Sequence, residues 1–129
     1  MQPLAERRTI ATVYVSGPFS ASTQDRIFAN QRAASVCATR ILELGFAPLC
    51  PHTNVLDIGS LSYEEIMAVD FALLRQCDAV FLMPNWRQSP GAIREEAHAR
   101  LHRIPVFEDL EVMASALRMA RQAIEAQAA

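Results

Sequence analysis

Cysteine is scarce in this chain of 129 residues. Its three cysteines, Cys37, Cys50 and Cys77, are an odd number, have no C-x-x-C spacing, and each stand among apolar neighbours. A disulfide framework needs paired cysteines, and redox or zinc motifs need close spacing. We therefore expect three free thiols that pack as small apolar side chains in a cytoplasmic protein.

Clustered positive charge and long apolar runs are also missing. The formal net charge is −2, whereas binding to a nucleic-acid polymer rests largely on clustered Lys and Arg. No segment approaches the roughly 18 to 20 continuous apolar residues of a membrane span, and residues 1–8 lack the apolar stretch of a signal peptide. We therefore expect a small-molecule partner, with neither a nucleic-acid polymer nor a membrane.

The familiar cofactor and metal motifs are absent too. Ser16-Gly17-Pro18 follows an expected strand, but it has neither the lysine of a Walker loop nor the glycines of a G-x-G-x-x-G fingerprint. His98 and His102 are four residues apart, yet no H-E-x-x-H motif and no third ligand accompany them. The sequence therefore predicts no metal and no cofactor.

The chain does contain enough apolar residues, 51%, for a single packed core. Strand-like and helix-like patterns alternate along it: strands are expected at 9–15, 46–49, 79–83 and 103–107, and helices at about 24–44, from Ser62, from Ser89 and at 109–126. Such alternation predicts an α/β fold with one doubly wound parallel sheet, Rossmann-like or flavodoxin-like, in the order 2-1-3-4 with helices on both faces. We expect one domain over residues 1–129, with a core at 8–108.

The densest chemical signal lies in residues 89–95. Ser89 and Pro90 are typical of a helix start, where unpaired backbone N–H groups and the helix dipole stabilise an anion. Glu95 follows on the face that carries the small residues Gly91 and Ala92. A single glutamate on a helix can simply be solvated, and its neighbour Glu96, which points about 100° away, is expected to be so.

Topology selects the same region. In such a sheet, ligands bind beyond the carboxyl ends of the strands where the strand order reverses, here between the first and third strands. Trp86 and Arg87 lie in the loop at this point, where they could stack on a base, form a lid or contact another subunit. Asp70, on an otherwise apolar helix stripe, needs a partner or backbone amides if it is buried. Asp78 is interpreted as a structural turn residue.

Three segments together resemble a known family. They are Val13-Tyr14-Val15-Ser16-Gly17-Pro18, Asp70 with Cys77-Asp78-Ala79-Val80, and Ser89-x-Gly91-Ala92-x-x-Glu95-x-x-x-Ala99. Their order and spacing are similar to those of the nucleoside 2-deoxyribosyltransferase superfamily. Within it, the chain looks most like the small deoxyribosyltransferase-like proteins and the nucleoside 5′-monophosphate N-glycosidases. The resemblance extends from about Thr9 to Phe107.

The resemblance implies a covalent mechanism without a cofactor. Glu95 would attack the anomeric carbon of a (deoxy)ribose and expel the base, after which water gives hydrolysis and a second base gives transfer. Asp70 matches an aspartate that positions the substrate, and Tyr14 matches an aromatic residue at the same strand end. Ser89 matches the serine that contacts the 5′-phosphate in the monophosphate hydrolases, where the transferases commonly have an acidic residue. The first loop lacks the arginine of those hydrolases.

These observations give a set of candidate residues. The expected catalytic residues are Glu95, Asp70 and Tyr14, and the expected substrate-binding residues are Ser16, Gly17, Pro18, Ser20, His52, Trp86, Arg87, Ser89 and Gly91. The first hypothesis is an N-glycosidase acting on a (deoxy)nucleoside 5′-monophosphate. The alternatives are a base-exchanging deoxyribosyltransferase and a nucleotide-binding protein without turnover. The resemblance also implies a homodimer or a higher homo-oligomer, and the last helix either covers the sheet or forms a subunit contact.

Overall fold

A four-stranded parallel sheet forms the centre of the computed structural model, which describes residues 10–51 and 61–128. Its strands are β1 (Thr12–Ser16), β2 (Ala47–Leu49), β3 (Ala79–Leu82) and β4 (Val106–Phe107). The strand order is β2-β1-β3-β4, and every pairing is parallel. The predicted order 2-1-3-4 is therefore confirmed. In register, Tyr14 pairs with Leu49 on one side and with Val80 on the other.

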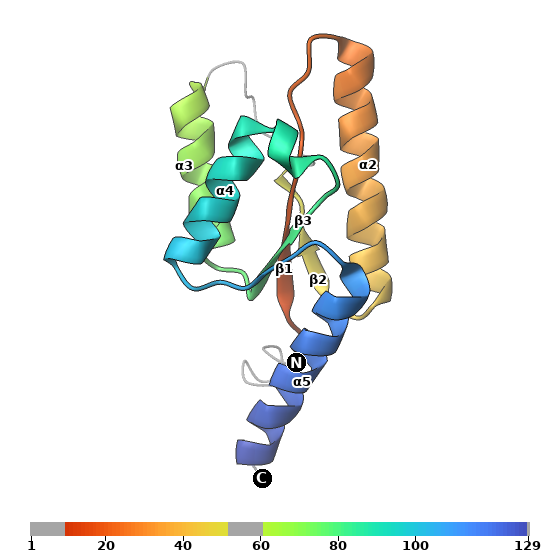
Figure 1. Ribbon diagram of the computed structural model, residues 1–129, viewed down its shortest axis with the longest axis vertical. Helices are drawn as coiled ribbons and strands as arrows, with labels where there is room; N and C mark the ends of the chain where they lie inside the picture. The colour runs from red at the N-terminus through yellow and green to blue at the C-terminus, as the bar shows by residue number, and fades with distance from the viewer. Residues whose placement is uncertain (1–9, 52–60, 129) are drawn as a thin grey trace, which may run out of the picture.

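Within residues 10–51 and 61–128, four α-helices and one 3-10 helix connect and cover the strands (Figure 1). They are α2 (Gln24–Glu43), α3 (Tyr63–Leu74), η3 (Trp86–Gln88), α4 (Pro90–Leu101) and α5 (Leu110–Ala128). Residues of α2 and α5 pack with Val13, Val15 and Phe81 in one core cluster. Residues of α3 and α4 pack with Tyr14, Val80 and Leu82 in the other. Helices thus cover both faces of the sheet, and the fold is the predicted doubly wound α/β fold.

The alternation of side chains along β1 decides which residues can reach the site. Successive residues of a strand point to opposite faces, so Val13 and Val15 face α2 and α5 whereas Tyr14 and Ser16 face α3 and α4. Ser16 is a fully buried polar residue at the carboxyl end of the strand. Burying a hydroxyl group without a hydrogen-bond partner costs free energy. Ser16 is therefore expected to have a polar neighbour on the face of the sheet that α4 covers.

Short-range capping signals in the sequence fix the starts of three helices. Ser62 and Glu65 form the predicted capping box, with N···O distances of 3.1 Å in both directions. The Ser89 hydroxyl accepts from the Ala92 amide at 3.2 Å, and Pro90 occupies the first turn of α4. Asp109 likewise accepts from the Val112 amide at 2.9 Å.

Asp78 ties two strands together. Its carboxylate accepts from the Thr12 amide at 2.8 Å, and its own amide donates to the Thr12 carbonyl at 2.8 Å. Both contacts hold the start of β1 beside the start of β3. The interpretation of Asp78 as a structural turn residue is therefore confirmed.

Two expectations for the strands need correction. The first strand begins at Thr12, later than predicted. The fourth strand is only Val106–Phe107, because Arg103 has φ 58° and the Ile104 amide still donates to the Ala99 carbonyl at 2.9 Å. A left-handed arginine turns the chain out of α4 and cannot begin a strand.

Two further expectations concern the cysteines and the presence of a membrane-spanning segment. None of the three cysteines forms a disulfide; Cys50 and Cys77 are buried and Cys37 is half-buried. Among the described helices, none has both the length and the apolarity that crossing a bilayer demands.

Candidate active site

Glu95 lies at the centre of a polar cluster on the α3 and α4 side of the sheet. Its side chain is buried, with 5% of its surface exposed. The Tyr14 hydroxyl donates to Glu95 Oε2 at 2.5 Å, and the Ser16 hydroxyl donates to Oε1 at 2.7 Å. Both donors come from the same face of β1, two residues apart, so one strand end holds both carboxylate oxygens of a residue on α4.

Asp70 brings a third element, α3, to the cluster. Its half-buried carboxyl group is hydrogen-bonded to that of Glu95. Burial raises the pKa of Asp70 to about 6. Of the two kinds of partner expected for Asp70, the structure shows a carboxyl group, that of Glu95.

The pKa of Glu95 is raised from 4.5 to about 7, chiefly because burial removes water from its charged form. The bonds from Tyr14 and Ser16 act in the opposite direction, and the neighbouring charge of Asp70 raises the pKa further. Two interacting carboxyl groups titrate as a pair. Burial thus raises the pKa values of both carboxyl groups towards neutrality, and the pair can hold one proton between about pH 6 and about pH 7.

Tyr14 stays protonated in this setting. Burial and the adjacent carboxyl groups of Glu95 and Asp70 all raise its pKa above the ordinary value. A phenol that does not ionise can only donate a hydrogen bond to the carboxylate. Tyr14 is thus a fixed donor that favours the ionised form of Glu95.

The loop after β1 passes close to β3. Gly17 is buried, and a Cβ atom at this position would lie 2.8 Å from the Met83 side chain. Only glycine fits there without a shift of Met83. Pro18 follows half-buried and Ser20 is exposed. The predicted binding loop therefore lies next to Ser16, at the carboxyl edge of the sheet.

The N-terminus of α4 lies one and a half turns before Glu95. The Ser89 hydroxyl caps the helix by accepting a hydrogen bond, which leaves its own proton to donate elsewhere. Gly91 faces α3, where an added Cβ would lie 3.7 Å from Met67 Sδ and from the Tyr63 hydroxyl. A methyl group would fit at that distance, so packing alone does not require this glycine.

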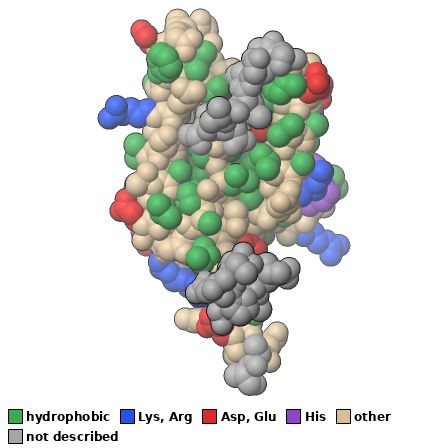
Figure 2. Space-filling model, turned by 180° about the vertical axis from the view of Figure 1, so that it is seen from behind, with side chains coloured by type: hydrophobic (Ala, Val, Ile, Leu, Met, Phe, Trp, Pro, Cys, Tyr) green, Lys and Arg blue, Asp and Glu red, His purple; other side chains and the backbone are tan. Residues whose placement is uncertain are grey.

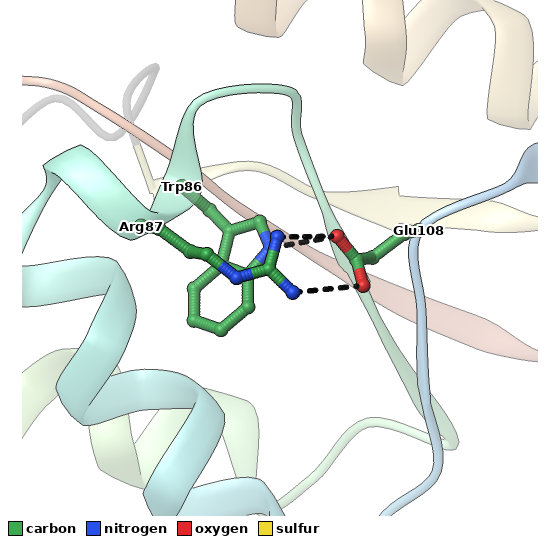
Figure 3. A network of polar contacts seen from close by, with 3 residues as sticks. All are labelled: Trp86, Arg87 and Glu108. Atoms are coloured by element: carbon green, nitrogen blue, oxygen red, sulfur yellow. Dashed lines mark hydrogen bonds and ion pairs between the residues drawn. The ribbon is translucent and has the colours of Figure 1, made fainter.

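Trp86 and Arg87 form a second polar cluster, together with Glu108 (Figure 3). The Trp86 indole N–H donates to Glu108 Oε1 at 2.9 Å, and Arg87 forms an ion pair with the same carboxylate at 3.3 Å. The Arg87 guanidinium also lies over the Trp86 ring, 4.6 Å from its centroid. These contacts fasten the loop before α4 to the residue that follows β4.

A cavity of about 450 Å³ adjoins this cluster. Its lining residues are Leu82, Met83, Pro84, Asn85, Trp86, Arg87, Gln88 and Glu108. Another cavity, of about 560 Å³, lies on the opposite face of the sheet beside α2. Neither Glu95 nor Asp70 lines either of these two cavities. Trp86 and Arg87 thus line a cavity with Glu108 and not with the carboxyl pair, although Trp86 also packs against the core cluster that contains Tyr14.

Glu108 is a polar residue of this edge that sequence reasoning missed. It comes directly after the edge strand β4, which does not lie at the point where the strand order reverses, so the rule that selected the loops after β1 and β3 does not select it. Its partners Arg87 and Trp86 are 21 and 22 residues away in the sequence, so no short sequence motif predicts these hydrogen bonds.

Glu96 was expected to be solvated, and this expectation is wrong. The residue is 8% exposed, and its carboxylate forms an ion pair with Arg100 one turn later on α4. The reason is the position of α4, which contacts α3, η3, β1, β3 and β4. A helix surrounded in this way buries more than one narrow stripe of side chains.

Of the three histidines, the structure describes His98 and His102. His52 lies outside the described residues. The His98 ring stacks on Phe71 with centroids 4.2 Å apart, and His102 lies 4.4 Å away. Figure 2 shows the visible histidine side chains at one edge of the molecule, beside basic side chains. Within residues 10–51 and 61–128, no group of three or more His, Cys, Asp or Glu side chains could hold a metal ion.

Comparisons with known proteins agree on the fold. A model of the family described as Domain of unknown function (DUF4406) matches residues 11–108. The structure of a 2-deoxyribosyltransferase from the psychrotolerant bacterium Bacillus psychrosaccharolyticus is similar, with a TM-score of 0.59 and 17% identity over 83% of this chain and 96% of that one. The solution structure of BlsM is similar with a TM-score of 0.56 and 15% identity, over 91% and 93% of the two chains. No curated protein sequence matches.

Proposed function

The chain belongs to the family described as Domain of unknown function (DUF4406), and we propose that it cleaves the N-glycosidic bond of a nucleoside 5′-monophosphate or nucleoside. One observation carries the proposal: both oxygens of the buried Glu95 carboxyl group are held by hydroxyl donors, and the Asp70 carboxyl group lies beside it. The shared fold with a 2-deoxyribosyltransferase supports it.

In the proposed reaction Glu95 is the nucleophile. Departure of the base gives an oxocarbenium-like transition state, which a carboxylate stabilises and then captures. The bond between the anomeric carbon and the base nitrogen breaks, and an ester bond forms between that carbon and Glu95. The Asp70 carboxylic acid supplies the proton that the leaving base takes. This step needs the proton of the singly protonated pair on Asp70. Because the pKa of Glu95 is the higher of the two, that proton first passes from Glu95 to Asp70, which leaves Glu95 as the carboxylate that attacks.

Water completes the hydrolysis. It attacks the anomeric carbon, its proton passes to the Asp70 carboxylate, and the ester releases Glu95 as a carboxylate. A second base in place of water would give base exchange, which is the alternative reaction. Tyr14 and Ser16 act throughout by holding the Glu95 oxygens and opposing the rise in its pKa.

The 5′-phosphate belongs to the more specific part of the proposal. Ser89 has a hydroxyl proton to donate at the N-terminus of α4, where the helix dipole favours an anion. Ser20 is exposed in the loop after β1, where it can supply a further donor. Arg87 is held by Glu108 in this structure, so it can reach a phosphate only by leaving that ion pair. Three thiols without a disulfide support a cytoplasmic setting.

A panel of nucleosides and their 5′-monophosphates tests this function. Released base and sugar are separated by liquid chromatography, and the protein mass is measured after rapid quenching. We expect free base from at least one monophosphate and a glycosyl adduct that the Glu95→Ala variant does not form. Product formation with an added acceptor base would favour exchange. Saturable nucleotide binding without any product would contradict both reactions and favour a binding protein.

A further inference from the structure

The last part of α5 extends beyond the rest of the molecule. The first half of this helix is anchored, because Met113, Ala114 and Leu117 are buried against the sheet. From Arg118 to Gln127 every residue is exposed. Arg118 marks the boundary, since its guanidinium donates to the Leu44 carbonyl at 2.9 Å. Figure 1 shows the helix end projecting past the sheet and the other helices.

The apolar stripe of α5 does not stop where the body of the protein stops. The spacing that buries Met113 and Leu117 continues to Ala120 and Ile124 on the same helix face. Ile124, the large apolar residue of this continuation, is 67% exposed. Helices gain most of their stability from packing an amphipathic face, and exposed apolar patches mark interaction sites. This continuity calls for a partner along residues 118–127.

The charges beside the stripe show which partner fits. Arg121 and Glu125 lie next to Ile124, one turn apart, and form an ion pair at 3.2 Å. If two copies of the helix cross in antiparallel fashion at the level of Ala123, Arg121 of one copy lies level with the partner's Glu125. The same contact occurs twice by symmetry. A parallel pair in register would instead place like charges at the same level.

The side chains at the crossing are small. Ala120 and Ala123 lie within the exposed segment, and such residues let two helices approach closely. We propose that a second copy of this chain covers the segment 118–127, in an antiparallel helix pair with Ile124 at its centre and Arg121 and Glu125 at its edge. The interface is independent of the proposed enzymatic activity.

The oligomeric state of the full chain tests this surface. Light scattering after gel filtration should give the mass of a dimer for the wild type and of a monomer for Ile124→Glu. The matched control is Gln122→Glu, which adds the same charge on the opposite side of the helix and should leave the dimer intact. Circular dichroism checks that each variant is folded. A monomeric wild type, or a dimeric Ile124→Glu variant that is folded, would overturn the proposal.

Charge reversal tests the antiparallel direction. Arg121→Glu and Glu125→Arg should each weaken the dimer about tenfold, because two like-charge contacts replace two ion pairs. A mixture of the two variants should recover wild-type affinity, since every contact between the different chains is then attractive. Sedimentation of the mixture measures this recovery. A mixture that associates no better than its separate components would contradict the antiparallel pairing.

Discussion

Two glutamates at the same edge of the sheet have pKa values that are shifted in opposite directions. Glu95 and Glu108 each accept a hydrogen bond from an aromatic side chain, Tyr14 in one case and Trp86 in the other, and each has a second donor. Yet the pKa of Glu95 is raised to about 7, whereas that of Glu108 is lowered. Glu95 is 5% exposed, while the Glu108 side chain is 53% exposed.

The difference shows that burial decides the direction of the pKa shift when two carboxyl groups have similar hydrogen-bond donors. In the exposed cluster, donors and water both favour the carboxylate, so Glu108 serves as a charged anchor. In the buried cluster, the loss of water outweighs two hydrogen bonds, so the pKa values of Glu95 and Asp70 are both raised towards neutrality. Only the buried cluster has the properties that covalent and acid-base chemistry require.

The largest effect is expected for Glu95→Gln, which keeps the shape and removes the nucleophile. Base release should fall by about 10⁴-fold, because removing a nucleophile eliminates the covalent route. Steady-state release of base measures this loss. Glu64→Gln is the matched control, since Glu64 is an exposed carboxylate on α3 whose partner is Arg94. A Glu95→Gln variant as active as this control would contradict the assignment.

The same variant makes a prediction about stability. The folded state binds a proton on Glu95 between pH 4.5 and about 7 that the unfolded state has released. The free energy of unfolding should therefore decrease as the pH rises through this interval and stay low above it. Glu95→Gln removes the part of this dependence that Glu95 causes and should be more stable than the wild type above pH 7, by about 3 kcal/mol. Urea titrations at several pH values measure the difference.

Asp70→Asn should have the next largest effect. The variant loses the proposed proton donor, so base release should fall by about 10² to 10³-fold. Asp70 also raises the pKa of Glu95 through its charge and its hydrogen bond. Without it, the acidic limb of the pH profile should move to lower pH, and the alkaline limb should disappear. An unchanged profile would show that Asp70 does not act on Glu95.

Tyr14→Phe should shift the same limb in the opposite direction. The Tyr14 bond lowers the pKa of Glu95, so its loss raises that pKa and moves the acidic limb to higher pH. Activity should fall about tenfold near pH 6 and less near pH 8. Ser16→Ala should shift the limb in the same direction, because the Ser16 bond also lowers that pKa. A uniform loss at every pH would indicate a structural effect instead.

Much of the fold could be predicted because its signals are local. The capping box at Ser62 and the Ser89-Pro90 start each lie within a few residues of sequence. The alternation of strands and helices then restricts the sheet order to few choices. The convergence of Tyr14, Ser16 and Glu95 follows from this order and from the alternation of side chains on β1.

What escaped prediction depends on surroundings that no short segment contains. Arg103 adopts φ 58° without being glycine or asparagine, and Glu96 is buried because five other elements contact α4. Glu108 meets Trp86 only after two strands have paired. His52 lies outside the described residues, and its predicted role stays a prediction.

The smallest effect is expected at the exposed glutamate. Glu108→Ala should release Trp86 and Arg87, and because Trp86 is the single tryptophan of the chain, its fluorescence reports this release directly. KM should rise by less than about fivefold with kcat nearly unchanged, since exposed ion pairs contribute little.

Glu108→Gln keeps an acceptor for the indole N–H and should lie between the wild type and Glu108→Ala. High salt should move the wild type towards Glu108→Gln, because exposed charges are screened whereas the buried pair is not. A kcat that falls as far as in Asp70→Asn would mean that the two clusters act as one.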